Sequence, residues 1–142
     1  MNTEYKIRHA LPSDVAFVYS TWLNSYKRDS ALGKSTRDTI FFNEYRFVVD
    51  YILNRPNVDV MVCCHPDEIS VIFGYAVYEP GILHYVFVKE AFRRLGIAKA
   101  LLTDARDAFE ITTHRTSSGD LTGHTLAHNP FLLFKTLEGE SK

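Results

Sequence analysis

The chain has 142 residues, of which 46% are hydrophobic and 23% are charged, and its formal net charge is −1. This composition is typical of one globular domain, and the balanced charge provides no general attraction to nucleic acids or membranes. The longest apolar run, residues 15–19, is far shorter than the roughly 20 residues that cross a bilayer. The first six residues lack the basic and then apolar order of a signal peptide. We therefore expect a small α/β domain located in the cytoplasm.

The first third of the chain predicts one strand and two helices. Residues 5–8 form a short strand, and Pro12, Ser13 and Asp14 then favour a helix start, because Ser and Asp side chains accept free backbone N–H groups. Apolar residues recur behind them with helical spacing at positions 15, 18, 19, 22, 23 and 26. The polar segment 27–37, with four basic residues and one acid, is predicted to be a loop. Residues 39–54 are predicted to be a second helix.

Three strands joined by short turns are predicted in the middle of the chain. From residue 58 to residue 64 the hydrophobic pattern changes to a period of two, and residues 69–79 and 82–88 repeat it after turns that contain proline. Strands linked in this way form an antiparallel meander. Cys63 and Cys64 would point to opposite faces of their strand, so no disulfide is expected between them.

The remaining elements are weaker. A helix is predicted from Ile97 to about Phe109, followed by a loop at residues 112–123. Residues 125–128 are predicted to form a short strand, and residues 130–137 a last short helix.

The passage from the third meander strand into the next helix, residues 88–98, has an anion-binding pattern. Gly96 lets a ligand approach the backbone at the turn, and the start of the helix exposes unpaired N–H groups. Arg93, Arg94 and Lys99 add positive charge. The pattern predicts a site for a diphosphate, and the alternative is an ordinary strand–helix corner with solvated basic side chains.

Three separated segments resemble the GNAT superfamily of N-acetyltransferases, and they follow one another along the chain in the order that the family has. Arg93-Arg94-Leu95-Gly96-Ile97-Ala98 is similar to the family signature of Arg or Gln, two residues, Gly, one residue, and Gly or Ala, which follows a strand ending in Val. Residues 72–79, with Gly74 before alternating apolar residues, and residues 7–14 are similar as well. The resemblance covers about residues 5–109.

The resemblance implies a fold and a domain organisation. We expect one GNAT-like α/β (α+β) domain over residues 1–142, with a mixed, mostly antiparallel central sheet flanked by helices. Residues 110–142 are an atypical C-terminal segment in this comparison.

The resemblance also implies acetyl-coenzyme A as co-substrate and transfer of its acetyl group to a primary amine by direct attack. The pantetheine arm would pair with the backbone of Phe87 and Val88, where the family's sheet splits, and the pyrophosphate would lie on the amides of residues 94–99. The implied cofactor-binding residues are Phe87, Val88, Arg93, Arg94, Leu95, Gly96, Ile97, Ala98, Lys99 and Asn129.

The reaction requires a proton acceptor, because an alkylammonium ion has a pKa near 10.4 and only the neutral amine attacks. The resemblance to family members with histidines on this strand indicates His84, four residues before Val88. Strand alternation would place His84 on one face with Val86, and Leu83 on the other with Tyr85. Glu79 is the second candidate base, and a histidine merely satisfied by hydrogen bonds is the structural alternative for His84.

Two departures from the family support a different function. The family has a tyrosine about seven residues after an asparagine that Asn129 matches, but Thr136 stands there and no tyrosine follows Tyr85. The sequence also ends at Lys142, before the family's last two strands. The alternative function is therefore a non-catalytic GNAT-derived binding or regulatory module, with or without coenzyme A. We also expect a homodimer, or another partner, to cover the sheet edge near residues 125–128.

Two further patterns concern metals and the acceptor. His124 and His128 have a spacing that could hold zinc on a helix, with His114 nearby, but Gly and Pro bracket the pair, so no metal site is expected. The resemblance implies that residues 27–37 border the acceptor amine. Their net charge of +3, four basic residues less one acid, then predicts that amines carrying an anionic group are preferred to spermidine, and the alternative is that these are solvated loop charges with no role.

Overall fold

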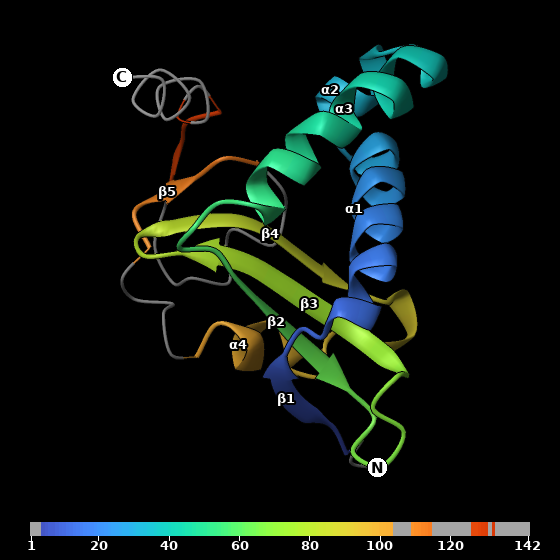
Figure 1. Ribbon diagram of the computed structural model, residues 1–142, viewed down its shortest axis with the longest axis vertical. Helices are drawn as coiled ribbons and strands as arrows, with labels where there is room; N and C mark the ends of the chain where they lie inside the picture. Colours follow the sequence, from blue (N-terminus) through green and yellow to red (C-terminus); the bar gives the residue numbers. More distant parts are fainter. Residues whose placement is uncertain (1–3, 104–108, 115–125, 131, 133–142) are drawn as a thin grey trace.

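The computed structural model describes residues 4–103, 109–114, 126–130 and 132. Helices and strands follow one another along the chain and appear in Figure 1. Their bounds are β1 (Lys6–His9), η1 (Pro12–Asp14), α1 (Val15–Asp29), α2 (Ala31–Ser35), α3 (Asp38–Leu53), β2 (Asp59–Cys64), β3 (Ile72–Glu79), β4 (Ile82–Val88), η2 (Glu90–Phe92), α4 (Ile97–Leu101), β5 (Ile111–Thr112) and β6 (Ala127–His128).

The described strands form one sheet with the order β1-β2-β3-β4-β5-β6. The pairs β1–β2, β2–β3 and β3–β4 are antiparallel, which confirms the predicted meander. The pairs β4–β5 and β5–β6 are parallel. The predicted mixed, mostly antiparallel sheet is therefore confirmed.

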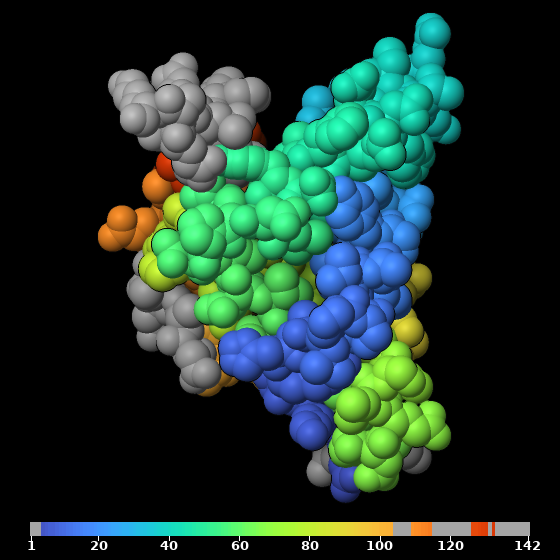
Figure 2. Space-filling view, in the orientation of Figure 1, coloured from blue at the N-terminus to red at the C-terminus, as the bar shows by residue number. Residues whose placement is uncertain are grey.

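Helices cover both faces of this sheet. α1 and α3 lie on one face, and α4 lies on the other (Figure 1). Trp22, Val49 and Tyr75 belong to the core on the first face, whereas Ala76, Ile97 and Leu101 belong to the core on the second. Figure 2 shows α1 and α3 spread over the first face, with the start of α3 projecting beyond the sheet. None of the helices among the described residues is long and apolar enough to cross a bilayer.

The adjacent cysteines follow the alternation of β2. Cys64 packs in the core under α1 and α3, and Cys63 packs in the core under α4. Both are buried free thiols, because neighbouring residues of a strand point to opposite faces.

A β-bulge in β4 overturns the predicted alternation around His84. The register shifts so that Val77 faces Tyr85 while Tyr78 faces Leu83, which leaves His84 as an extra residue in β4. Leu83 consequently packs in the same core as Val86, although strand alternation had predicted opposite faces. A bulge inserts one residue into the alternating pattern, and a period of two does not reveal it.

The predicted loop at residues 27–37 is wrong, because most of it is helical. α1 continues to Asp29, and α2 follows after Ser30, whose Oγ accepts a hydrogen bond from the N–H of Gly33 at 2.9 Å. A Cβ on Gly33 would lie 2.4 Å from the carbonyl oxygen of Lys27. The two helices therefore meet more closely than any residue other than glycine allows.

The C-terminal predictions are only partly covered by the described residues. α4 ends at Leu101, and Phe109 is not helical, so the helix predicted from Ile97 to Phe109 does not extend to its expected end. β5 was missed, because the sequence assigned Thr112 to a loop. β6 confirms the short strand within the predicted range 125–128. Residues 104–108, 115–125, 131 and 133–142 lie outside the described residues.

Candidate functional site

The sheet opens beside the second half of β4. β4 pairs with β5 only at Ile82 and Leu83, and the N–H of Thr113 then donates to the carbonyl of Leu83 at 3.2 Å. Among the described residues, no strand pairs with β4 on this side from His84 to Val88. A pocket of about 830 Å³ adjoins this open edge. Within the described part of the sheet, the split that the resemblance implied at Phe87 and Val88 lies along this edge.

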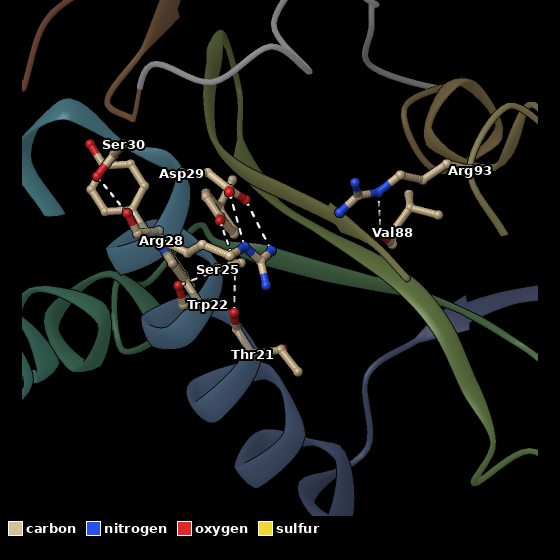
Figure 3. A network of polar contacts seen from close by, with 10 residues as sticks. Thr21, Trp22, Ser25, Arg28, Asp29, Ser30, Val88 and Arg93 are labelled. Carbon is tan, nitrogen blue, oxygen red and sulfur yellow. Dashed lines mark hydrogen bonds and ion pairs between the residues drawn. The ribbon is translucent and has the colours of Figure 1, made fainter. Parts of the chain in front are cut away.

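One end of the pocket is built by the loop between η2 and α4. Arg94 and Gly96 have left-handed backbone conformations, with φ of 68° and 81°, a geometry that costs a residue with a side chain roughly 1–2 kcal/mol. No heavy atom lies within 4 Å of the place a Cβ on Gly96 would take, so the backbone is open there. Arg93 donates from Nε to the carbonyl of Val88 at 3.0 Å (Figure 3).

Most of the predicted cofactor-binding residues meet at this end. The pocket is lined by Phe87, Val88, Arg93, Arg94, Gly96, Ile97, Ala98 and Lys99. Leu95 and Asn129 are not among the described residues that line it. The side chain of Leu95 is exposed, and the backbone of Asn129 bonds to Thr112 at the other edge of β5. The basic side chains and open backbone fit a phosphorylated ligand.

The opposite wall comes mainly from α1 and was predicted only in part. Ser25, Tyr26, Asp29 and Ser30 line it together with Tyr85 of β4. Asp29 and Ser30 belong to the segment 27–37 that was expected to border the acceptor amine. No local motif marks Ser25 or Tyr85, and the helical spacing assigned Tyr26 only to the core. Their place became apparent only when α1 was packed against β4.

A directed pair of hydroxyl groups lies in this wall. Ser25 donates from Oγ to the carbonyl of Thr21 at 2.6 Å, so its single proton is used. Tyr85 must therefore donate to the Oγ of Ser25, 2.6 Å away. Burial raises the pKa of Tyr85 to about 12. Tyr85 is thus a neutral phenol whose oxygen retains free lone pairs.

The charged residues of segment 27–37 do not form the predicted cationic rim. Of that segment, only Asp29 and Ser30 line the pocket. Hydrogen bonds from Arg28, each 3.0 Å long, lower the pKa of Asp29 (Figure 3). Lys27 is turned away, since its Nζ bonds to the carbonyl of Gly33 at 2.6 Å and pairs with Asp38 at 3.0 Å. The tertiary structure therefore places the carboxylate of Asp29, paired with Arg28, where the sequence predicted a surface of positively charged side chains.

Both predicted base candidates lie behind the pocket wall. His84 is fully buried, and neither it nor Glu79 is among the residues that line the pocket. His84 Nε2 lies 2.8 Å from the Oε2 of Glu79, and Arg55 bonds both oxygens of that carboxylate at 2.7 and 2.9 Å. Burial opposes ionisation of Glu79, but the hydrogen bonds from Arg55 and His84 outweigh it and lower its pKa. Burial also lowers the pKa of His84.

A second buried histidine, His114, continues this polar cluster. Its Nδ1 lies 2.9 Å from the Oγ1 of Thr113, which in turn lies 2.8 Å from the Nδ1 of His84. Its Nε2 is hydrogen-bonded to the hydroxyl of Tyr45. Burial lowers the pKa of His114 to about 3. The aromatic rings around it are those of Trp22, Tyr26, Tyr45 and Tyr85.

These histidines do not gather into a metal site. No group of three or more potential ligand side chains is found among the residues that the structure describes. His124, the first residue of the weighed pair, lies outside them. His114 has both ring nitrogens engaged, by Thr113 and Tyr45.

Comparison with known proteins identifies the fold. No protein-family model and no curated protein matches the sequence. Among solved structures, a candidate acetyl transferase from Pyrococcus furiosus is 16% identical with a TM-score of 0.60, and the match covers 96% of this chain and 92% of that one. The protein YjaB from Escherichia coli, in its apo form, is 15% identical with a TM-score of 0.52, over 72% of this chain and 65% of that one.

A candidate acetyltransferase of the GNAT family from Desulfovibrio desulfuricans is 17% identical with a TM-score of 0.47, over 72% of this chain and 64% of that one. The matched region is thus slightly less than two thirds of the YjaB and Desulfovibrio proteins. At such identities the likeness concerns the fold alone. The chain shares the fold of the candidate acetyl transferase from Pyrococcus furiosus, in agreement with the fold that the resemblance to the GNAT superfamily implied.

Proposed function

We propose that this protein transfers the acetyl group of acetyl-coenzyme A to a primary amine. The observation that carries the proposal is the pocket itself. Its volume of about 830 Å³ is in the usual range for small-molecule sites. It joins an open strand edge and three basic side chains at one end to hydroxyl and aromatic groups at the other.

The residues present suit acetyl-coenzyme A. Arg93, Arg94 and Lys99 would face its phosphates, together with the open backbone at Gly96, and the free edge of β4 would pair with the amides of its pantetheine arm. When bound, this co-substrate supplies an acetyl thioester, which an amine can attack. Arg93 donates a hydrogen bond to the carbonyl of Val88. It would therefore have to keep this bond while it contacts a phosphate, or break it.

The α1 wall suits the acceptor amine. The oxygen of Tyr85 retains lone pairs that can accept a hydrogen bond from an N–H group, because its own proton is directed to Ser25. The ring of Tyr85 stacks on Trp22 with centroids 5.0 Å apart, which holds the hydroxyl in place. This wall would orient the amine nitrogen.

A second candidate function is a binding or regulatory module that keeps coenzyme A without catalysing transfer. One observation favours it. Among the described residues that line the pocket, the only carboxylate is Asp29, which Arg28 holds, and no imidazole is present. A protein with this pocket could bind the co-substrate and lack a base in contact with the amine.

The partner proposal concerns β6. Ala127 and His128 are exposed, and β6 is the last strand in the order of the described sheet. Exposed strand edges favour pairing with another chain. A homodimer through β6 would appear in light scattering as twice the monomer mass, and a monomer at tens of micromolar would contradict it.

One experiment separates the two functions. The protein is incubated with acetyl-coenzyme A and a panel of primary amines, including tyramine, lysine, spermidine and an alanine-terminated peptide, and release of free thiol is recorded. Binding of acetyl-coenzyme A is measured in parallel by calorimetry. Thiol release that depends on an amine supports the transferase. Binding without turnover supports the module, and the absence of binding contradicts both.

A further inference from the structure

We infer that the acceptor is a diamine, whose reacting nitrogen binds at Tyr85 while its second, protonated nitrogen binds the carboxylate of Asp29. This inference rests on the proposed acetyl transfer and names the class of amine that the pocket takes. It makes Asp29 a specificity-determining residue. It also reverses the preference for anionic amines that the charge of residues 27–37 predicted.

The hydroxyl groups at the α1 end of the pocket mainly accept hydrogen bonds. The Oγ of Ser25 donates to the carbonyl of Thr21 at 2.6 Å, and the Oγ of Ser30 donates to the carbonyl of Tyr26 at 2.5 Å. Tyr85 donates to Ser25. These three hydroxyl protons are directed into the protein, so only lone pairs remain for a ligand. The hydroxyl of Tyr26 is the one neutral donor left among the side chains described at this end.

A carboxylate completes this set of acceptors. Asp29 lines the pocket, and each of its two oxygens accepts one hydrogen bond from Arg28 at 3.0 Å. A carboxylate oxygen has two lone pairs, so each oxygen can accept a second bond. Arg28 is not among the described residues that line the pocket, so a ligand meets the acid of this pair rather than the base. Figure 3 shows the pair on α1, across from Val88 and Arg93.

The end of α1 adds a further preference for positive charge. α1 ends at Asp29, so the negative end of the helix dipole lies at this wall. An ammonium ion is attracted there by the helix end and by Asp29. A carboxylate would be repelled by both and would find only the hydroxyl of Tyr26 as a donor. The wall therefore favours a cationic amine over an anionic one.

The spacing of the two acceptor positions fits a short diamine. Ser25, which orients the hydroxyl of Tyr85, and Asp29 are four residues apart on α1, which places their Cβ atoms about 5–6 Å apart. Ser25 and Tyr85 are buried, whereas the side chain of Asp29 is 58% exposed. The reacting nitrogen would thus lie in the interior of the pocket and the second nitrogen near its opening. A short alkyl chain joins two nitrogens over such a distance.

The basic residues near Asp29 do not exclude a cationic acceptor. After Arg28, the charges of Arg93 and Lys34 also lower the pKa of Asp29. Arg93 lines the end of the pocket assigned to the phosphates of coenzyme A, which would neutralise its charge. Lys34 is not among the described residues that line the pocket. Asp29 therefore remains the charged side chain that a ligand meets at the α1 end.

The transfer step removes two protons from the reacting nitrogen. Its ammonium form first loses one proton to water. The neutral nitrogen then forms a bond to the acetyl carbon while the carbon–sulfur bond breaks, and a second proton of that nitrogen neutralises the departing thiolate. The other ammonium group keeps its charge and its contact with Asp29 throughout.

Three acceptors that share one alkyl chain test the class of amine. Putrescine, pentylamine and δ-aminovalerate differ only in the far group, which is an ammonium, a methyl or a carboxylate. At saturating acetyl-coenzyme A, kcat/KM should be about tenfold higher for putrescine than for pentylamine, because a hydrogen bond to a charged group is formed only by putrescine. δ-Aminovalerate should have the lowest value. The inference is overturned if pentylamine or δ-aminovalerate equals putrescine.

Two variants should move this preference in opposite directions. Asp29→Asn removes the charge and should make kcat/KM for putrescine and pentylamine nearly equal. Arg28→Gln leaves the carboxylate entirely to the ligand and should raise the ratio about twofold, the effect of releasing an exposed ion pair. Asp38→Asn is the matched control, because this exposed carboxylate pairs with Lys27 and is not among the described lining residues. It should leave the ratio unchanged.

The outcomes separate this inference from the proposed function. If the wild-type protein acetylates amines and Asp29→Asn keeps the preference for putrescine, or Asp38→Asn loses it equally, Asp29 does not determine specificity and the transferase remains. If Asp29→Asn and Arg28→Gln shift the ratio in the same direction, a change of shape accounts for the effect, and the inference is overturned as well. If the wild-type protein acetylates no amine, the proposed function fails, and the inference about its acceptor fails with it.

Discussion

The two ends of the pocket are built in different ways. The end near α4 comes from one continuous segment, residues 87–99, and consists of open backbone and exposed basic side chains. The end near α1 combines α1 with β4, and behind it Tyr45, Glu79 and His114 meet from distant parts of the chain. A binding surface made of main chain can thus be encoded locally, whereas a buried polar network requires the whole fold.

The largest expected effect concerns the local end. Gly96→Glu should weaken binding of acetyl-coenzyme A at least about 100-fold, because a carboxylate would face the phosphates across a backbone that is now open. The measurement is calorimetric titration. Gly96→Gln is the matched control, since it has the same size and the same backbone strain at φ 81° without the charge. Equal affinity of the Glu variant and the wild-type protein would mean that the phosphates bind elsewhere.

The next prediction compares buried and exposed ion pairs. Glu79→Gln should lower the free energy of unfolding by about 3–5 kcal/mol, because it leaves Arg55 as an uncompensated charge in a pair whose side chains are each only 9% exposed. Asp29→Asn, in a pair with side chains 64% and 58% exposed, should cost no more than about 1 kcal/mol. Urea denaturation of both variants checks this. Similar losses in the two variants would contradict the proposed difference between the buried pair and the exposed pair.

The buried end should also make stability depend on pH. Burial lowers the pKa of His114 to about 3, so the unfolded chain binds a proton near pH 6.5 that the folded protein does not. The stabilisation is therefore complete above about pH 6.5 and is lost as the pH falls toward 3, by about 1.4 kcal/mol per pH unit for this histidine.

His114→Gln tests the assignment, because glutamine does not titrate. Its free energy of unfolding should fall less steeply than that of the wild-type protein between pH 6.5 and the onset of acid unfolding. Parallel curves for the two proteins would show that His114 is not the residue responsible.

The smallest effect is expected on the α2 side of the pocket. Lys34→Glu combined with Arg37→Glu should change the preference between spermidine and an amine with a carboxylate, such as lysine, by less than about twofold, because neither residue lines the pocket and exposed charges are screened. Ratios of kcat/KM measure this. A clear shift of the preference toward spermidine in the double variant would support the cationic rim that the sequence predicted and contradict this placement of the two residues.

Sequence patterns predicted the parts of the fold that depend on neighbouring residues. Period-two alternation predicted the meander, whose last strand, Ile82–Val88, has the expected bounds. The helix predicted at residues 39–54 matches α3 within a residue at each end. The Gly96 turn and its basic neighbours were apparent because their spacing is local. The missed elements, α2 and β5, are only five and two residues long, too short for a clear periodicity.

The candidate site could be predicted only in part. Eight of the ten implied cofactor-binding residues line one pocket, and Leu95 and Asn129 do not. His84 was singled out, but the bulge in β4 and the ion pair behind it were not visible in the sequence. Thr113 and His114 were assigned to a loop or weighed as a metal ligand. Their hydrogen bonds span up to 69 positions along the chain, beyond any local pattern.

The sequence by itself determined the meander, the long helices and the basic turn, because periodicity and backbone conformation depend on residues a few positions apart. Only the tertiary structure decided which polar groups became buried together, and therefore which of them are charged, which donate and which accept. The carboxylate of Glu79 decides which nitrogen of His84 carries the proton only after folding has removed water from both side chains. The acid–base character of this protein is a property of its packed interior.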